Sequence, residues 1–206
     1  MFVTLAAPAV CRLATLDQAR ARIPAAAGLD DARLGALIDD KSAAISSYCR
    51  RALGRAQYRL TACGPVSRVP ALAPWPVVSI DAVAISGAAA AAESVEIAAL
   101  DLYWLVDGAR SIWPAGLISV DLTGGWRLPD EPTDSAPALP HVVTAACIDL
   151  VARVISADGR DPALRRESIV GVAQFDYAAP TDQMLKGCLP IDVAASLDPF
   201  VFRVSV

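Results

Sequence analysis

The sequence has few of the residues that enzymes use for chemistry. It contains one histidine, His141, and its five cysteines include no Cys-x-x-Cys pair. It also lacks the glycine patterns of a phosphate-binding loop and of a dinucleotide-binding turn. Any Ser/His/Asp or Cys/His machinery would have to use His141, and a zinc site would have too few ligands. We therefore expect no catalytic residue, no bound metal and no cofactor.

Charged and aromatic residues are scarce as well. Charged residues make up 19% of the chain and aromatic residues 6%, whereas hydrophobic residues reach 55%. This composition leaves more apolar surface than one small core needs, which indicates a large subunit interface or a membrane. No segment approaches the roughly 20 uninterrupted apolar residues of a spanning helix, so we expect no membrane contact. The net charge of −4 argues against a protein that holds nucleic acid by neutralising phosphates.

The amino-terminal residues are apolar but do not have the pattern of a secretory signal. No Lys or Arg precedes the apolar stretch, and Thr4 and Pro8 interrupt it. The cysteines are odd in number and widely spaced, which suits reduced thiols in a cytoplasm. We therefore expect the protein not to be exported.

Two helices are expected before residue 55. Thr15–Gln18 has the pattern of a capping box, and Pro24 ends the short helix that it opens. Asp30 can cap a second, longer helix, in which apolar residues recur at three- and four-residue spacing. Two arginines would lie in its last turn, and Gly54 is placed to end it.

Between residues 57 and 126 the hydrophobic period changes to two, which is typical of strands. Tyr103–Val106 followed by Asp107-Gly108 indicates a hairpin, because a type I′ turn needs positive φ at both central residues. Ile118–Leu122 alternates in the same way, and Gly124-Gly125 closes that strand. These segments predict a small antiparallel sheet inserted between helices.

Residues 127–140 form a proline-rich, acidic linker, and Pro140 suits the start of a helix from His141 to about Ala157. Most apolar residues of this helix share one face, but Ile148 and Ile155 fall toward its polar side. A helix that is apolar over most of its circumference is buried on more than one side. Such burial is possible within one small domain and expected within a ring of packed subunits, so Ile148 and Ile155 are candidates for a subunit interface.

The last seven residues alternate as a strand does. One face would carry Phe200, Phe202, Val204 and Val206, and the other Val201, Arg203 and Ser205. Pro199 separates them from the helix-like segment Ile191–Leu197, because proline cannot continue a helix. The strand either completes the protein's own sheet or is donated to another subunit by main-chain pairing. We favour donation, because a chain end is usually polar and frayed.

Two groups of charged residues have both a functional and a structural interpretation. Asp30-Asp31 and Asp39-Asp40 could supply a catalytic or metal-binding pair, but helix caps and solvated surface explain them better. Arg50, Arg51, Arg55 and Arg59 are flanked by two tyrosines, as in a patch that binds nucleic acid. Helix-end capping and strand solvation explain the same arginines, and we favour that interpretation.

The order of six segments resembles one known family. They are Asp31–Ile38 continuing through Ile45–Leu53, the proline-rich Leu72–Val83, Ile118–Trp126, the helix after Pro140, Glu167–Val172, and the ending Leu197–Phe200. In this order they resemble the phage head–tail connector (adaptor) family, which includes adaptors of gene transfer agents. The resemblance covers most of residues 13–206, and its strength lies in the order of the segments.

The resemblance implies a structural role. Members of the family form a ring, usually dodecameric, that docks beneath the portal protein and receives a tail or stopper protein on its other side. DNA would pass through the lumen without sequence recognition. The C-terminal segment commonly enters the portal, which here assigns portal binding to Phe200–Val206. The location would be the neck of a virion or phage-like particle that is assembled in the bacterial cytoplasm.

The expected fold is α+β and mainly α, with a helical core, an inserted small antiparallel β-sheet and an extended C-terminal strand. Residues 1–206 would form a single adaptor domain. Its parts would be helices in 15–54, the sheet in 57–126, the linker at 127–140, a buried helix at 141–157 and a C-terminal arm at 158–206.

We expect a structural head–tail connector and not an enzyme. One alternative is a soluble tail-completion protein that never touches the portal. A less favoured alternative is a small hydrolase that uses His141.

Overall fold

Helix and strand occur in near-equal amounts in this protein. The computed structural model describes residues 2–6, 11–70, 75–98, 101–134, 136–157, 166–169, 173–176, 185–186 and 189–202. Helix accounts for 39% and strand for 37%, with two multi-stranded antiparallel sheets. The prediction of a mainly α fold with one small sheet is therefore wrong. Several of the strands have only two to four residues, which is too short to give a period-two pattern in the sequence.

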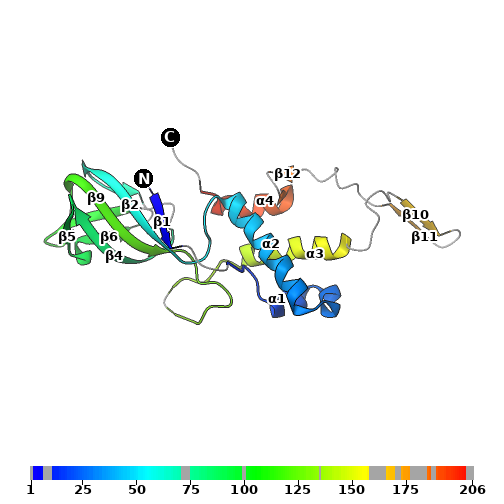
Figure 1. Ribbon diagram of the computed structural model, residues 1–206. Helices are drawn as coiled ribbons and strands as arrows, with labels where there is room; N and C mark the ends of the chain where they lie inside the picture. The colour runs from blue at the N-terminus through cyan, green and yellow to red at the C-terminus, as the bar shows by residue number, and fades with distance from the viewer. Residues whose placement is uncertain are drawn as a thin grey trace. The chain divides into compact units, whose positions relative to one another are not determined.

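The chain divides into two compact units (Figure 1). We call residues 1–11, 51–139 and 202–206 the β unit, and residues 12–50 and 140–201 the helical unit. The expectation that the whole chain acts as one adaptor domain stays a prediction.

The helical unit begins with the elements that the sequence predicted. They are α1 (Leu16–Arg22), the 3-10 helix η1 (Pro24–Gly28) and α2 (Asp31–Cys49). The capping box is confirmed: the Gln18 backbone N–H donates to Thr15 Oγ1, and the Thr15 backbone N–H donates to Gln18 Oε1, each at 3.0 Å. The Asp30 cap is confirmed too, because the Arg33 N–H donates to its carboxylate at 2.7 Å.

Helix α2 ends five residues earlier than predicted. Its last residue is Cys49, and Arg50 caps it in the left-handed conformation, with φ of 55°. The Arg50 N–H reaches carbonyls of the last turn, so the helix end is satisfied without a glycine. Gly54 instead forms an isolated β-bridge with Trp126 in the β unit. An added Cβ at Gly54 would lie 2.9 Å from Leu128 Cδ1, so this glycine permits a close approach of two segments.

Helix α3 (His141–Ala157) begins after Pro140, as predicted, and is the centre of the helical unit. It contacts α1, η1, α2 and α4 (Ile191–Leu197). The buried side of α2 carries Leu34, Ile38 and Ile45, and α3 buries Val143, Cys147 and Val151. Ser42 is a polar residue of this core: it is 1% exposed, accepts a hydrogen bond from the Leu13 N–H at 3.1 Å and lies 3.6 Å from Cys147 Sγ.

The β unit consists of two antiparallel sheets. Its strands are β1 (Phe2–Ala6), β2 (Ala56–Val66), β3 (Val69–Pro70), β4 (Val77–Ile85), β5 (Ala88–Ala90), β6 (Val95–Ala98), β7 (Asp101–Val106), β8 (Ala109–Ser111) and β9 (Trp113–Gly124). One sheet has the order β1-β2-β9-β4-β5, and the other has β3-β7-β6 with β8 also paired to β7. The 3-10 turn η2 (Ala92–Ser94) connects β5 to β6. The apolar start of the chain is thus an edge strand, paired with β2.

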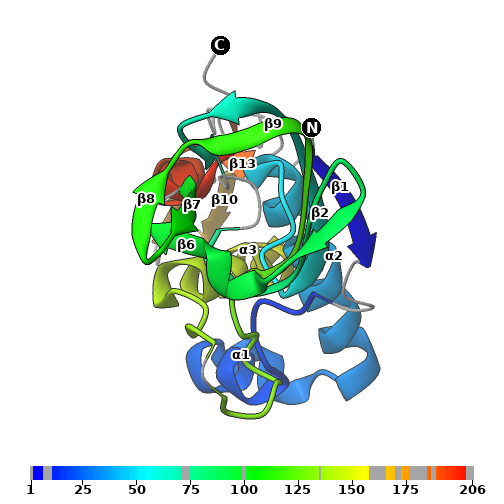
Figure 2. The same ribbon diagram turned by 90° about the vertical axis from the view of Figure 1, so that its left-hand side faces the viewer.

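The two sheets enclose one hydrophobic core, around which the strands curve in Figure 2. Alternate residues of β2 and β9 point inward, among them Leu60, Val120 and Leu122. Trp113 is completely buried, and its indole N–H donates to the Leu102 carbonyl at 3.3 Å. This bond satisfies the only polar atom of the indole, so the largest side chain in the core leaves no donor unpaired.

Two turn predictions in the β unit are confirmed. Asp107 and Gly108 connect β7 to β8 with φ of 51° and 77°, as a type I′ hairpin requires. Strand β9 ends at Gly124, and Gly125 follows with φ of 116°. A Cβ on Gly125 would collide with the Gly54 carbonyl, so glycine is needed here for both conformation and space.

The linker at 127–139 is anchored to the β unit. The Arg55 guanidinium donates to Glu131 Oε2 at 2.8 Å and also pairs with Asp134. Arg127 exchanges backbone hydrogen bonds with Pro137 and Leu139. The segment that composition marks as a linker is therefore held by side-chain and backbone contacts.

The described residues after α3 include four short strands. They are β10 (Arg166–Ile169) paired with β11 (Ala173–Asp176), and β12 (Leu185–Lys186) paired with β13 (Leu189–Pro190). The sequence alternates from Ser168 to Tyr177 as a single strand would, but the structure has two antiparallel strands there, with residues 170–172 and Tyr177 outside the described residues. Across the described parts of the chain, no helix combines the length and apolar character that crossing a membrane requires.

Candidate interaction site

The predicted portal-binding segment follows helix α4 at the end of the helical unit. Helix α4 is held by its apolar face, because Val193, Ala194 and Leu197 are all buried. A 3-10 turn, η4 (Asp198–Phe200), continues from it, and the Val201 N–H donates to the Asp198 carbonyl at 3.3 Å. Helix α4 therefore packs by its apolar face against the rest of the helical unit, and the turn η4 follows directly after it.

The first three residues of the predicted C-terminal strand are not in a strand in the structure. Phe200 lies in the 3-10 turn η4, and Val201 and Phe202 belong to no strand. Arg203, Val204, Ser205 and Val206 lie outside the described residues. The extended C-terminal strand of the fold prediction is therefore corrected at Phe200, because Pro199 supplies the fixed φ that starts a helical turn as readily as an extended segment.

A hydrogen bond from α2 secures the same turn. The Tyr48 hydroxyl donates to Asp198 Oδ1 at 2.7 Å and lies 3.3 Å from the Ala194 carbonyl. Sequence reasoning missed this pair, because Tyr48 fits the apolar pattern of α2 and Asp198 lies 150 residues further on. No local signal connects two such positions.

The two candidate interface residues of α3 have different surroundings. Ile148 is 3% exposed and belongs to the core of the helical unit. Ile155, in the last turn of α3, is half-buried. Helical periodicity alone predicted that both side chains point toward the polar side of α3. Because α3 is covered by four other elements, the position of Ile148 is buried within the chain itself.

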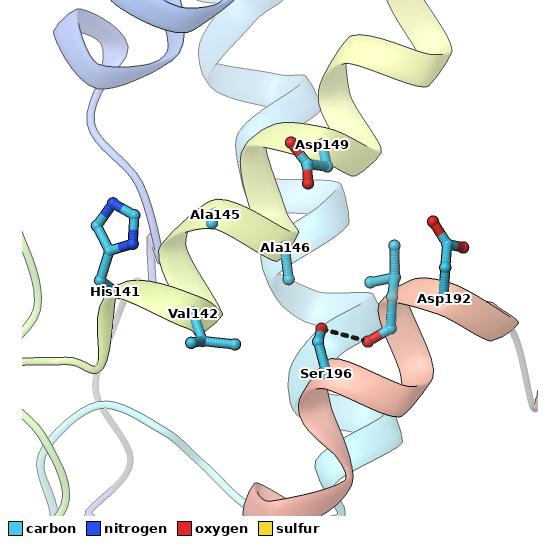
Figure 3. Close-up of a pocket in the computed structure, with 8 residues that line it drawn as sticks. His141, Val142, Ala145, Ala146, Asp149, Asp192 and Ser196 are labelled. Carbon is cyan, nitrogen blue, oxygen red and sulfur yellow. Dashed lines mark hydrogen bonds between the residues drawn. The ribbon is translucent and has the colours of Figure 1, made fainter.

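A groove of about 240 Å³ lies beside α3 and α4 in the helical unit. Its apolar lining is Val142, Ala145, Ala146 and Val193, and its polar lining is His141, Asp149, Asp192 and Ser196. Figure 3 shows the His141 imidazole directed away from Ser196. The same groove is therefore lined by the His141 imidazole, the Ser196 hydroxyl and two carboxylates, but the imidazole does not point toward the hydroxyl.

The polar groups of the groove have other partners. Ser196 Oγ donates to the Val193 carbonyl of its own helix at 2.7 Å. Asp192 pairs with Arg153, and Asp149 lies 3.9 Å from Arg22. Desolvation opposes ionisation of Asp192, but the Val193 N–H and Arg153 stabilise the carboxylate, so its pKa is lowered. Within the part of the chain that the structure describes, no hydrogen bond connects His141 to Ser196 or to an acid.

The paired acids of α2 also have structural partners. Asp30 caps the helix and Asp31 pairs with Arg20. Asp39 accepts two hydrogen bonds from Arg12, at 2.7 and 2.9 Å, which lower the pKa of its carboxyl group. Among the described residues, no group of three or more His, Cys, Asp or Glu side chains is placed to hold a metal ion.

The guanidinium groups of Arg51, Arg55 and Arg59, in the suggested nucleic-acid patch, have partners within the β unit. Arg51 donates to the Trp75 carbonyl and lies over the Trp126 ring, 4.6 Å from its centroid. Arg59 makes two hydrogen bonds of 2.6 Å to Asp121, across β2 and β9. Arg55 pairs with the linker, as described above, whereas Arg50 caps α2 with its backbone N–H and has an exposed side chain. These contacts agree with the structural interpretation that the sequence favoured.

Comparison with known proteins adds information on the fold. No protein-family model matches this chain, and no curated protein matches it either. A chain in the virion of a native gene transfer agent (GTA) particle superposes with a TM-score of 0.54 and 20% identity, over 100% of this chain and 97% of that chain. A chain in the neck of an empty GTA particle, computed with C6 symmetry, gives 0.55 and 20% over the same shares. A chain in the neck of a native GTA particle, computed with C12 symmetry, gives 0.50 and 19%, again over 100% and 97%.

This protein shares its fold with chains of GTA particles. The match extends over both chains almost end to end, so it includes the β unit as well as the helical unit. The resemblance seen in the order of sequence segments is thus supported at the level of fold. At 19–20% identity the likeness carries no residue-by-residue assignment.

Proposed function

We propose that this protein is a structural head–tail connector in the neck of a phage-like particle. The observation that carries the proposal is the fold shared with GTA neck chains over the full length of this chain. A fold alone does not determine function, but a match that leaves no extra domain on either chain favours the same kind of role. The neck of the particle is then the location, with assembly in the bacterial cytoplasm.

In this role the protein forms a ring around a DNA channel. The C6 and C12 symmetries of the related neck structures favour six or twelve copies, and we propose twelve. A ring needs a head-to-tail interface, in which two different surfaces of one subunit meet those of its neighbours. Exposed apolar side chains are available for such contacts: Val142, Val154 and Ile191 on the helical unit, and Ile112 and Leu117 on the β unit.

Among the candidate interface residues, Ile155 fits the proposed ring better than Ile148. Ile155 is half-buried at the end of α3, close in sequence to the exposed Val154, whereas Ile148 is needed in the core. Burying 1,000 Å² of apolar surface would stabilise the ring by roughly 25 kcal/mol before the costs of ordering. Even weak contacts, repeated around a ring, can therefore hold it together.

The C-terminal segment Phe200–Val206 is the proposed contact with the portal protein, and a tail or stopper protein would bind the other side of the ring. The net charge of −4 suits DNA that slides through the lumen, because few phosphates would be held. The proposed role needs no catalytic residue, cofactor or metal. It is a role in assembly and not in catalysis.

Native mass measurement tests the proposal. The full-length protein is measured alone and mixed with the portal protein encoded by the same particle. We expect a complex whose added mass is about 258 kDa, that is, twelve chains of 21.5 kDa. A protein that stays monomeric with the portal present would contradict the connector function.

Deleting residues 200–206 tests whether the C-terminal segment is the portal contact. A tail-completion protein, which never touches the portal, would not bind it even at full length. We expect the shortened chain to lose portal binding while it keeps its helical circular dichroism. Undiminished binding would show that a different part of the protein binds the portal.

A further inference from the structure

The hairpin between β7 and β8 ends in an exposed apolar tip. All residues from 106 to 112 are exposed, and this is the longest unbroken run of exposed residues in the described part of the chain. Val106 and Ala109 are paired across the turn, so their side chains lie on the same face of the hairpin. Val106 is 49% exposed. The tip therefore presents aliphatic side chains that its own unit leaves open to solvent.

The tip also carries one uncompensated charge. Arg110 makes two hydrogen bonds to Glu96, at 2.6 and 2.9 Å, and lies over the Tyr103 ring. Asp107 is exposed, and its carboxylate has no ion pair or hydrogen bond with another described residue. A surface that fits this tip therefore combines an apolar lining with a group that favours a carboxylate.

The groove beside α3 and α4 has such a lining. Its volume of about 240 Å³ lies below the roughly 300–1,000 Å³ of small-molecule sites, so the groove has room for a few side chains and not for a larger ligand. Val142, Ala145 and Val193 are among its apolar residues, and Val142 is 46% exposed.

The charges of the groove favour an acidic occupant over a basic one. Asp192 pairs with Arg153, and Asp149 lies 3.9 Å from Arg22, so both carboxylates already have arginine partners in their own chain. His141 and Asp192 lie at opposite ends of the groove in Figure 3. At the His141 end, the first turn of α3 favours negative charge through the helix dipole, and the imidazole can donate a hydrogen bond.

We propose that the β7–β8 hairpin of one copy docks in the α3–α4 groove of the next copy. Val106 and Ala109 pack on the apolar lining, and Asp107 lies beside His141. The hairpin and the groove are different surfaces of the chain, so the contact is head-to-tail, which is the kind that closes a ring. The polar pair sets the orientation more than the affinity. This inference rests on the proposed ring and adds which surfaces meet in it.

Disulfide cross-linking between two variants tests the contact. Val106→Cys and Val142→Cys are made in separate chains, each with Cys63→Ser, because Cys63 is an exposed thiol. The two proteins are mixed with the portal protein of the same particle, and native mass measurement checks ring formation before oxidation. We expect a disulfide-linked dimer in the mixture that neither variant gives alone.

Leu117→Cys in place of Val106→Cys is the matched control. Leu117 is 54% exposed in the same unit, but it lies within β9, opposite Cys63 of β2, and not at a hairpin tip. It should give no dimer with Val142→Cys. A ring without the cross-link between positions 106 and 142, or equal cross-linking from position 117, would overturn the hairpin contact and leave the connector function standing. If the unaltered protein forms no ring, both are wrong.

A second pair of variants serves if these replacements prevent assembly. Ala109→Cys and Ala145→Cys each add one sulfur atom, at the tip and in the groove lining, and should also cross-link only when mixed. Val106→Asp should raise the protein concentration for half-maximal ring assembly by about tenfold, because a carboxylate replaces the aliphatic contact. Leu117→Asp should leave that concentration unchanged. Equal assembly of the two aspartate variants would count against the hairpin contact.

Discussion

Replacing Ser42 by alanine tests how the helical unit is held together. Ser42 Oγ accepts the backbone N–H of Leu13, a residue with no exposed surface, at 3.1 Å. Alanine at position 42 would leave that N–H buried without an acceptor, which costs about 2 kcal/mol. Alanine is also the better helix former, by about 0.5 kcal/mol. We therefore expect the free energy of unfolding to fall by about 1.5 kcal/mol.

The matched control is Ser47→Ala on the same helix. Ser47 is exposed, so its replacement brings the gain in helix propensity without a lost buried hydrogen bond. Urea unfolding of the full-length proteins, followed by helical circular dichroism, should separate the two variants by about 2 kcal/mol, with Ser42→Ala the less stable. Equal unfolding midpoints for both would refute the reasoning that Ser42 holds the segment before α1 against α2.

Three further predictions concern different parts of the molecule. His141→Ala should leave gene transfer or particle infectivity intact, whereas loss of activity with normal particle assembly would favour the hydrolase alternative. Trp113→Ala should destabilise the β unit by about 3–5 kcal/mol, because it empties the centre of the core, and thermal unfolding measures the loss. Burial raises the pKa of the Cys147 thiol from 9.0 to about 11, so the folded state keeps a proton that the unfolded state loses. Stability should therefore be complete below pH 9 and decline as the pH rises toward 11, by up to about 2 kcal/mol; a Cys147→Ala protein with the same alkaline decline would contradict this.

The candidate site could be predicted only in part. The sequence pointed to the C-terminal residues as an attachment segment, because apolar and aromatic residues alternate there after Pro199. It could not indicate Tyr48, whose partner is 150 residues away. Nor could it show that Ile148 is buried by other elements of its own chain. A helical projection gives the direction of a side chain but not what lies opposite it.

Local signals were sufficient wherever the interacting groups lie within a few residues of each other. The caps at Thr15 and Asp30, the helix start after Pro140 and the hairpin at Asp107-Gly108 are of this kind. Each depends on a side chain or a φ value that satisfies the neighbouring backbone, so the sequence alone determined these features.

The balance of helix and sheet was decided by the tertiary structure. Strands such as β5 and β8 have three residues each and exist because they pair with β4 and β7. The arginines also found their partners only in the fold, as when Arg59 meets Asp121 from 62 residues away. Short strands and distant ion pairs gain their stability from contacts that only the folded chain brings together, and for that reason no window of sequence contains them.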